Sequence, residues 1–413
     1  MQDTPAEDSA SGATRVGLTV VLCFCIALLE GFDIQALGIS LGKLTTRFAL
    51  SADQRTLLTT FSSVGIVLGA VIGGRIADFR GRKPVLLFAV GGFGIFTLAT
   101  VLAPGFVVLL ALRMFASVGF GAALPMMMAI AAEIGRPQRK VATSAMMFCG
   151  MPAGGGTAGL LVQSLGPDFD WRLIFAVGGL IPLVLLPAVA LLLPETRVAG
   201  HVQRERPSAL VRALFGDGRL VMTLLLWLIL VPTLTILYLI LNWLPTLLAS
   251  KGFAGTVPAQ ATMLFNYGGV FGALLFGGVV DRLGVRWPLG LSYGALVVCL
   301  LALGAATGVA SALLLSGLAG FLLLGANYAM YGVAAACYPQ PVRGTGSGAC
   351  ISVSRLGSIL GPLLAGIWLS GGTAAAQVIG YMVPFSAMAL VAVLLLGRDL
   401  RKPGLPGAPS DRL

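Results

Sequence analysis

Twelve apolar runs, each long enough to cross about 30 Å of hydrocarbon as a helix, limit what this chain can fold into. They lie at about residues 16–38, 56–77, 84–103, 105–132, 141–165, 171–193, 221–249, 259–280, 287–306, 309–335, 344–369 and 376–396. With 57% hydrophobic and 10% charged residues, the 413-residue chain has too little polar surface to coat a soluble globule. No stretch of strand length alternates between apolar and polar residues, so the spans are not strands of a barrel. We therefore predict an all-α membrane protein with twelve transmembrane helices.

Polar stretches divide the twelve runs into two groups of six. The predicted organisation is a disordered N-terminal tail at 1–14, an N-terminal six-helix bundle at 15–194, a cytoplasmic linker at 195–219, a C-terminal six-helix bundle at 220–397 and a cytoplasmic tail at 398–413. Successive gaps between the runs lie on opposite sides of the membrane. About twenty lysines and arginines fall on one side and five on the other, and the richer side is expected in the cytoplasm. Both termini are then cytoplasmic.

The formal charge of +11 does not indicate nucleic-acid binding, because the basic residues lie in short gaps between apolar runs and form no basic face. The six cysteines show no metal-ligand spacing, and His201 is the sole histidine. No nucleophile and base are paired, and the glycine run 154–156 lies in an apolar segment with no phosphate-loop lysine, so it indicates close packing. We expect no enzyme activity, cofactor or metal, and the lipid bilayer as the surroundings.

The two halves share a pattern at an offset of 203 residues. Gly74, Asp78, Gly81 and Lys83 are followed, 203 residues later, by Gly277, Asp281, Gly284 and Arg286, and Lys140 by Arg343. A parallel duplication about an axis along the membrane normal explains the pattern. We expect a substrate site between the halves, near the middle of the membrane.

Two acids, Glu30 and Asp33, interrupt the first apolar run within the sequence Glu30-Gly31-Phe32-Asp33-Ile34-Gln35. On a helix they lie about 60° apart on one face. An ionised acid inside a spanning helix costs about 2.5–3.5 kcal/mol, so such acids usually face a pathway or a partner. The alternative is a position at the helix end, among lipid headgroups. Neither acid recurs at the repeat offset, where Thr233 and Ile236 stand, which favours a functional role.

Residues 74–83, Gly-Arg-Ile-Ala-Asp-Phe-Arg-Gly-Arg-Lys, resemble the signature of the major facilitator superfamily between its second and third helices. Arg113, Gly119 and Gly121 are similar to its fourth-helix motif, although Ser117 replaces a common glycine there. The resemblance implies a charge-paired cytoplasmic gate. The gating residues expected from the motif and its surroundings are Asp78, Arg82, Glu133, Asp281 and Arg343.

Within the superfamily the chain resembles the aromatic acid:proton symporters, most of all their hydroxyphenylpropionate transporters. The matching segments are Glu30-Gly31-Phe32-Asp33, Asn242-Trp243-Leu244-Pro245, Arg343-Gly344-Thr345-Gly346 and Arg355-Leu356-Gly357. Many members have aspartate where Glu30 stands. The resemblance implies uptake of a small aromatic carboxylic acid with protons, by alternating access, in a bacterial cytoplasmic membrane. We expect a monomer.

An anionic aromatic substrate needs a cation, a proton carrier and a pocket for its ring. Arg355, inside the eleventh run, suits bidentate carboxylate binding; the alternative is a fixed pair with an acid of another helix. Asp33 is the predicted proton acceptor, because a closed cavity favours the neutral acid. Glu30 either shares that proton or pairs with a cation. Arg113 either modulates Asp33 or is structural.

For the ring, the candidates are polar or aromatic residues in the second half's runs. They are Tyr238, Asn242, Tyr267, Phe271, Asn327, Tyr328 and Tyr331, whereas Trp243 is expected to anchor its helix at the membrane surface. Two other functions stay open. One is an antiporter that exports drugs or metabolites, although Gly150-Met151-Pro152-Ala153-Gly154 lacks the usual Gly-Pro pair. The other is a non-transporting receptor for aromatic acids, although only a short tail follows the last run.

Overall fold

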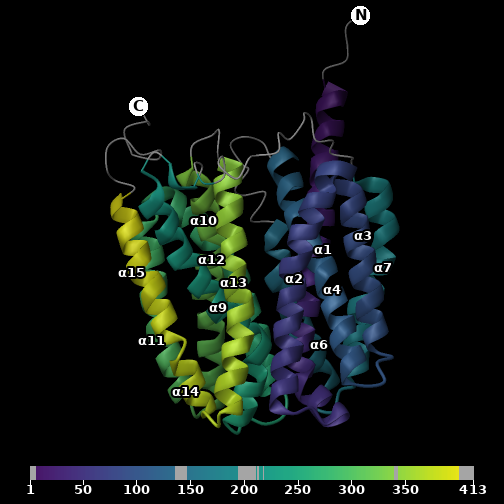
Figure 1. Cartoon of the computed structure of the whole chain (residues 1–413), viewed down its shortest axis with the longest axis vertical. Helices are drawn as coiled ribbons and strands as arrows, with labels where there is room; N and C mark the ends of the chain where they lie inside the picture. The colour runs from purple at the N-terminus through teal and green to yellow at the C-terminus, as the bar shows by residue number, and fades with distance from the viewer. Residues whose placement is uncertain are drawn as a thin grey trace, which may run out of the picture. The chain divides into compact units, whose positions relative to one another are not determined.

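The computed structural model describes residues 6–134, 147–193, 211, 214–216, 218–338 and 343–399, and their regular structure is entirely helical (Figure 1). The helices are α1 (Ala6–Phe48), α2 (Ala52–Arg80), α3 (Arg82–Thr100), α4 (Phe106–Ile134), α6 (Gly150–Leu165), α7 (Trp171–Leu192), α9 (Leu220–Ser250), α10 (Val257–Leu283), α11 (Arg286–Ala305), α12 (Val309–Cys337), α13 (Arg343–Ser370), α14 (Ala375–Gly380) and α15 (Val383–Asp399).

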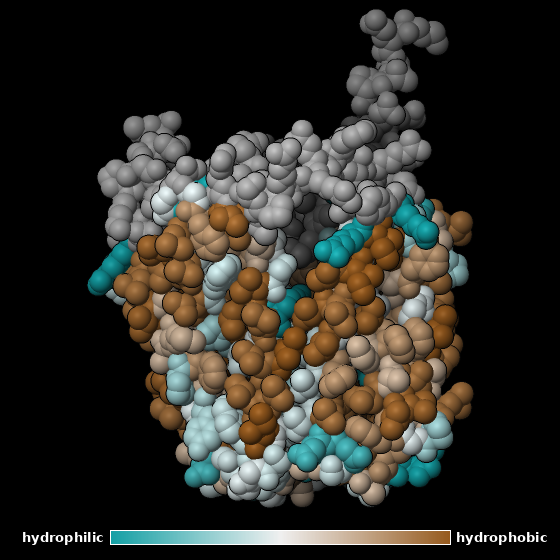
Figure 2. Space-filling view, in the orientation of Figure 1, coloured by the Kyte–Doolittle hydropathy of each residue, from teal (hydrophilic) through white to brown (hydrophobic). Residues whose placement is uncertain are grey.

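Within these ranges, eleven helical segments are long and apolar enough to cross a membrane. The predicted all-α membrane fold is confirmed. Of the fifth predicted run, residues 141–146 lie outside the described part, and α6 covers the last 16 residues. Large apolar side chains cover much of the face seen in Figure 2. Leu102, Val107 and Leu191 are among the most exposed large hydrophobic residues of the described chain. Such a surface is stable in hydrocarbon rather than in water.

Helix α1 is longer than the predicted run at both ends. It includes residues 6–14, which were predicted to be disordered; alanines and early acids favour a helix there. It also continues past the predicted end at about residue 38 and includes Lys43 and Arg47. The turn that follows is short, because Ser51 and Gln54 form a capping box at the start of α2, with each side chain bonded to the other's backbone N–H.

The contacts divide the chain into two compact units. The first comprises residues 1–33, 61–155 and 170–201, and the second comprises 34–60, 156–169 and 202–413, so the division passes through α1, α2 and α6. The first unit has an apolar core around Ile26, Phe93, Phe120 and Met127. The predicted linker at 195–219 lies largely outside the described residues, and the predicted domain boundaries stay predictions.

In the first unit, α2 packs directly on the backbone of α4. Gly65 and Gly69 face the carbonyl oxygens of Met114 and Val118 so closely that a Cβ at either glycine would clash. Small residues four apart on one helix face allow such close approach in membrane proteins. In the same way, Gly154 of α6 lies against the carbonyl oxygen of Leu28 of α1. The prediction that the glycine run serves close packing is confirmed at Gly154.

The second unit repeats these contacts at the same offset of 203 residues. Gly268 and Gly272 of α10 face the carbonyl oxygens of Gly317 and Phe321 of α12, and Gly357 of α13 faces that of Val231 of α9. The turns after α2 and α10 also correspond, because Gly81 and Gly284 have φ of 88° and 76°, a conformation that favours glycine. The duplication seen in the sequence is therefore also present in the helix packing inside each unit.

Candidate functional site

Asp33 and Arg113 form a buried ion pair in the first unit. Asp33 lies near the middle of α1 and is 0% exposed, and Arg113 lies on α4 and is 1% exposed. Nη1 of Arg113 donates to Oδ1 of Asp33 at 3.0 Å, and Nη2 donates to Oδ2 at 2.5 Å. This bidentate geometry is the strongest that a guanidinium and a carboxylate can form.

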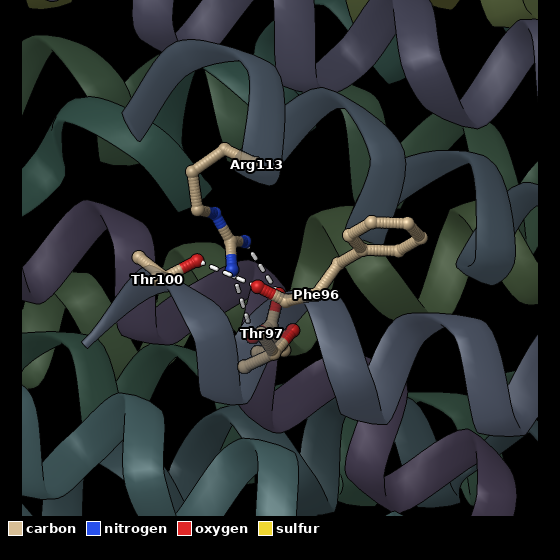
Figure 3. Close-up of polar contacts among 5 residues, drawn as sticks. Phe96, Thr97, Thr100 and Arg113 are labelled. Atoms are coloured by element: carbon tan, nitrogen blue, oxygen red, sulfur yellow. Dashed lines mark hydrogen bonds and ion pairs between the residues drawn. The ribbon is translucent and has the colours of Figure 1, made fainter. Parts of the chain in front are cut away.

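Two further residues hold this pair in place. The hydroxyl of Thr97 on α3 donates to Oδ1 of Asp33 at 3.1 Å, and the Arg113 guanidinium lies 5.0 Å from the ring centroid of Phe175 on α7. Figure 3 shows the Arg113 side chain reaching down from its helix toward Thr97 and Thr100 of α3. Breaking a buried ion pair by removing one partner costs about 3–5 kcal/mol, so the cluster is a strong constraint on α1, α3 and α4.

Helix α6 packs against α1 between the two acids. Gly31 faces the carbonyl oxygen of Met151 so closely that no side chain fits there. Glu30 is buried, like Asp33, and both lie far from either end of α1. The alternative position at a helix end among headgroups is wrong, because α1 continues for fifteen residues beyond Asp33, to Phe48.

The sequence left open whether Arg113 acts on Asp33, and the structure joins them directly. Thr97 and Phe175 were missed. Each belongs to a common residue type in an apolar run, and nothing along the chain distinguishes Thr97 from Thr100, which bonds the carbonyl of Phe96 within its own helix (Figure 3). Three donated hydrogen bonds reach the Asp33 carboxylate, one from Thr97 and two from Arg113.

In the second unit the structure brings Arg355 to Tyr238. Nη1 of Arg355, which is half-buried on α13, donates to the Tyr238 hydroxyl on α9 at 3.1 Å. Asn242 lies one turn further along α9, and its Nδ2 donates to the backbone carbonyl of Tyr238 at 2.8 Å. Three of the predicted binding residues therefore form one cluster. Their role in binding stays a prediction.

The remaining ring candidates lie on α10 and α12. Tyr267 is half-buried and covers Gly156 of α6. Tyr328 and Tyr331 meet edge to face, with ring centroids 6.2 Å apart. Asn327 is buried, and its Oδ1 has no hydrogen-bond partner among the described residues. It is an acceptor available to a donor from a ligand.

Two aromatic residues do not lie where the sequence suggested. Phe271 of α10 is 67% exposed, so it is a poor candidate for a binding site. Trp243 is 1% exposed inside the second unit, so it is not an anchor at the membrane surface. Both errors arise because hydropathy along a run does not reveal which face of a helix is buried.

The predicted gating residues lie at helix ends. Arg82 begins α3 and is half-buried, and Asp281 lies near the end of α10 and is exposed. The side chains of Asp78, Glu133 and Arg343 lie outside the described part of the structure. The charge-paired gate stays a prediction.

Comparison with known proteins agrees with the fold. Residues 23–272 match the Major Facilitator Superfamily. The chain belongs to this superfamily. It is 37% identical to the 3-(3-hydroxy-phenyl)propionate transporter of Escherichia coli over 94% of this chain and 95% of that protein. It is 33% identical to the gallate transporter of Pseudomonas putida over 86% of each chain.

A solved structure of a bacterial homologue of the human lysosomal transporter Spinster covers 96% of this chain, and this chain covers 98% of it. The TM-score is 0.72 at 16% sequence identity, a likeness that concerns the fold alone. The relatives' names confirm the resemblance to aromatic acid transporters. This superfamily member is therefore a multi-pass membrane protein of a transporter family and not an enzyme.

Proposed function

We propose that this protein imports an aromatic carboxylic acid, such as a hydroxyphenylpropionate or a hydroxybenzoate, together with protons. The observation that carries the proposal is the buried Asp33–Arg113 pair in a chain whose relatives are named as transporters of a hydroxyphenylpropionate and of gallate. The two six-helix halves alternate access to the two sides of a bacterial cytoplasmic membrane. Both termini are cytoplasmic, and the protein acts as a monomer.

Arg355 binds the substrate carboxylate. Its guanidinium is half-buried on an apolar helix, and one of its donors is given to a neutral hydroxyl, that of Tyr238. An anion offers charge-assisted hydrogen bonds about twice as strong as a neutral acceptor does. The nearby amide of Asn242 and the tyrosines of α10 and α12 suit a ring that carries hydroxyl groups.

Asp33 carries the proton, and its contact with Arg113 depends on whether Asp33 is charged. When Asp33 takes up a proton, its carboxyl loses the negative charge that attracts the guanidinium, so the bidentate pair opens. Arg113 stays over the ring of Phe175, which offers a cation a second favourable contact. Because Asp33 bonds to both α3 and α4, its protonation weakens the contacts of α1 with both helices, since a neutral carboxyl is a poorer acceptor. Glu30, one turn earlier, shares the proton.

Uptake into proteoliposomes tests the proposal. Labelled hydroxyphenylpropionate, hydroxybenzoate and gallate are offered with and without an inward proton gradient, and at least one should accumulate only with the gradient. We expect Asp33→Asn to abolish gradient-driven accumulation while substrate binding, followed by thermal shift, remains. The matched control is Asp53→Asn at an exposed position in the first turn of α2, which should leave uptake unchanged.

Equal uptake with and without the gradient would contradict proton coupling, and outward flux would favour the antiporter. Binding of an aromatic acid without any flux would favour the receptor. Full active transport by Asp33→Asn would exclude Asp33 as the carrier and leave Glu30 as the next residue to replace.

A further inference from the structure

Gln35 lies two residues after Asp33 on α1, and neither the proposed proton pair nor the substrate site uses it. Its side chain is fully buried in the second unit and makes two hydrogen bonds to other helices. Nε2 donates to the carbonyl of Leu241 on α9 at 2.8 Å, and Oε1 accepts from Nδ2 of Asn266 on α10 at 2.9 Å. One amide thus joins the C-terminal part of α1 to two helices more than two hundred residues away.

The Leu241 carbonyl is available because of Pro245. In a helix, the carbonyl of residue 241 accepts from the N–H of residue 245, and proline has no N–H. A bare carbonyl inside a protein or a membrane costs free energy unless another donor reaches it. Gln35 is the donor that reaches this one. The proline of α9 and the glutamine of α1 therefore act together: the first leaves the carbonyl without its helical donor, and the second donates to it.

Gly38 brings the α1 backbone close enough for this bond. It lies one turn after Gln35, and a Cβ there would clash with the same Leu241 carbonyl oxygen. One turn further, the contact ends, because a Cβ at Gly42 would meet no atom within 4 Å. Gly42 lines a cavity of about 530 Å³ with Lys43 and Thr246, and Gly38 lies at the edge of the same cavity. The tight contact is thus limited to the turn between Gln35 and Gly38.

We propose that Gln35, Asn266 and the Leu241 carbonyl freed by Pro245 form a latch that closes the C-terminal part of α1 on α9 and α10. The latch opens and closes again in each transport cycle, and only this last statement rests on the proposed function. The latch is uncharged, which suits a contact that must open. A neutral hydrogen bond contributes about 0.5–1.5 kcal/mol net because water replaces it, whereas separating a buried ion pair costs more.

Hydrogen–deuterium exchange of the full chain in lipid nanodiscs, without substrate, tests the latch. Gln35→Leu keeps most of the side-chain volume and leaves the Leu241 carbonyl and the Asn266 amide without their partner. We expect backbone exchange over residues 39–55 to rise about tenfold, the factor expected from one to two lost buried hydrogen bonds. Asn266→Ala, which removes one donor to Gln35, should raise it less.

Pro245→Ala distinguishes the latch from simple packing. The alanine N–H satisfies the Leu241 carbonyl within α9, so adding Gln35→Leu to this variant should raise exchange by about threefold or less. Gly42→Ala is the matched control for a change on the same helix, and Gly38→Ala is its counterpart at the contact. We expect exchange to rise in Gly38→Ala and to stay unchanged in Gly42→Ala.

An equal rise from Gln35→Leu with and without Pro245 would overturn the latch, and so would an unchanged rate in both Gln35→Leu and Asn266→Ala. Neither outcome depends on the substrate. A chain that fails to take up any aromatic acid but shows the expected exchange would keep the latch and remove the proposed function. Normal uptake by the chain, with no change of exchange in the variants, would keep the proposed function and exclude the latch.

Discussion

The interiors of the two halves differ at the positions where the duplication lets them be compared. In the first half, Asp33, Thr97 and Arg113 form a charged cluster that joins three helices. The residues that stand 203 positions later are Ile236, Leu300 and Ser316. All three are buried, and the Ser316 hydroxyl donates to the Ala312 carbonyl of its own helix at 2.7 Å. The second half has no counterpart of the ion pair at these positions.

The backbone contacts do not differ in this way. Gly69 of α2 contacts the carbonyl oxygen of Val118 on α4, and Gly272 of α10 contacts that of Phe321 on α12. Both glycines and both partners are related by the offset of 203 residues. The glycine packing is thus common to both halves, whereas the ion pair occurs at these positions in the first half alone. The comparison can be tested at four places.

The largest effect is expected at the ion pair. Arg113→Leu leaves Asp33 as a buried charge without its guanidinium, and the free energy of unfolding should fall by about 3–5 kcal/mol. Thermal denaturation of the purified protein in detergent measures the loss. The double variant Asp33→Asn, Arg113→Leu should recover much of it. Ser316→Ala, at the corresponding position, should cost about 1 kcal/mol or less, and a cost equal to that of Arg113→Leu would break the comparison.

Thr97 should give the next largest effect. Thr97→Val keeps the shape of the side chain but removes the hydroxyl that donates to Asp33, a bond to a charged group worth about 1.5–3 kcal/mol. The pH at which uptake is half-maximal should also shift, since this hydroxyl contacts the proposed proton carrier. Thr97→Ser should restore both quantities. Lost stability with an unshifted pH profile would make Thr97 a packing residue only.

The repeated glycines should give similar, smaller effects in both halves. Gly69→Ala and Gly272→Ala each force a Cβ against a backbone carbonyl, and each should lower the free energy of unfolding by about 1–3 kcal/mol. Gly74→Ala and Gly277→Ala are the matched controls, because a Cβ at either meets nothing within 4 Å. Thermal denaturation of the four variants compares them. A cost at only one of the two packed positions would contradict a shared scaffold.

Tyr238 should give the smallest effect. Tyr238→Phe removes the hydroxyl that accepts from Arg355, which should raise the KM for the aromatic acid about two- to tenfold and leave the maximal rate nearly unchanged. Uptake kinetics measure both quantities. Arg355→Lys, which loses the planar fork, is the stronger comparison and should raise KM further. An unchanged KM in both variants would remove this cluster from the binding site.

Much of the fold could be predicted from local properties of the sequence. Run length and hydropathy located the spans because a helix in hydrocarbon satisfies its own backbone, whatever its neighbours are. The offset of 203 residues indicated the duplication, and Glu30 and Asp33 were noticed because acids are costly inside an apolar run. The ends of α1 were predicted less well, since its alanines and the cap at Ser51 extend it beyond the apolar run.

The partners of these residues were decided by tertiary structure. Asp33 meets Arg113 across 80 positions of the chain, and Thr97 reaches the same carboxylate while Thr100 turns to its own helix. Phe271 and Trp243 occupy similar runs, yet one is exposed and the other buried. Composition along the chain specifies that a residue lies in a helix. Which face of that helix is buried, and which freed carbonyl or charge it meets there, depends on helices distant in sequence, as Gln35 and Pro245 illustrate.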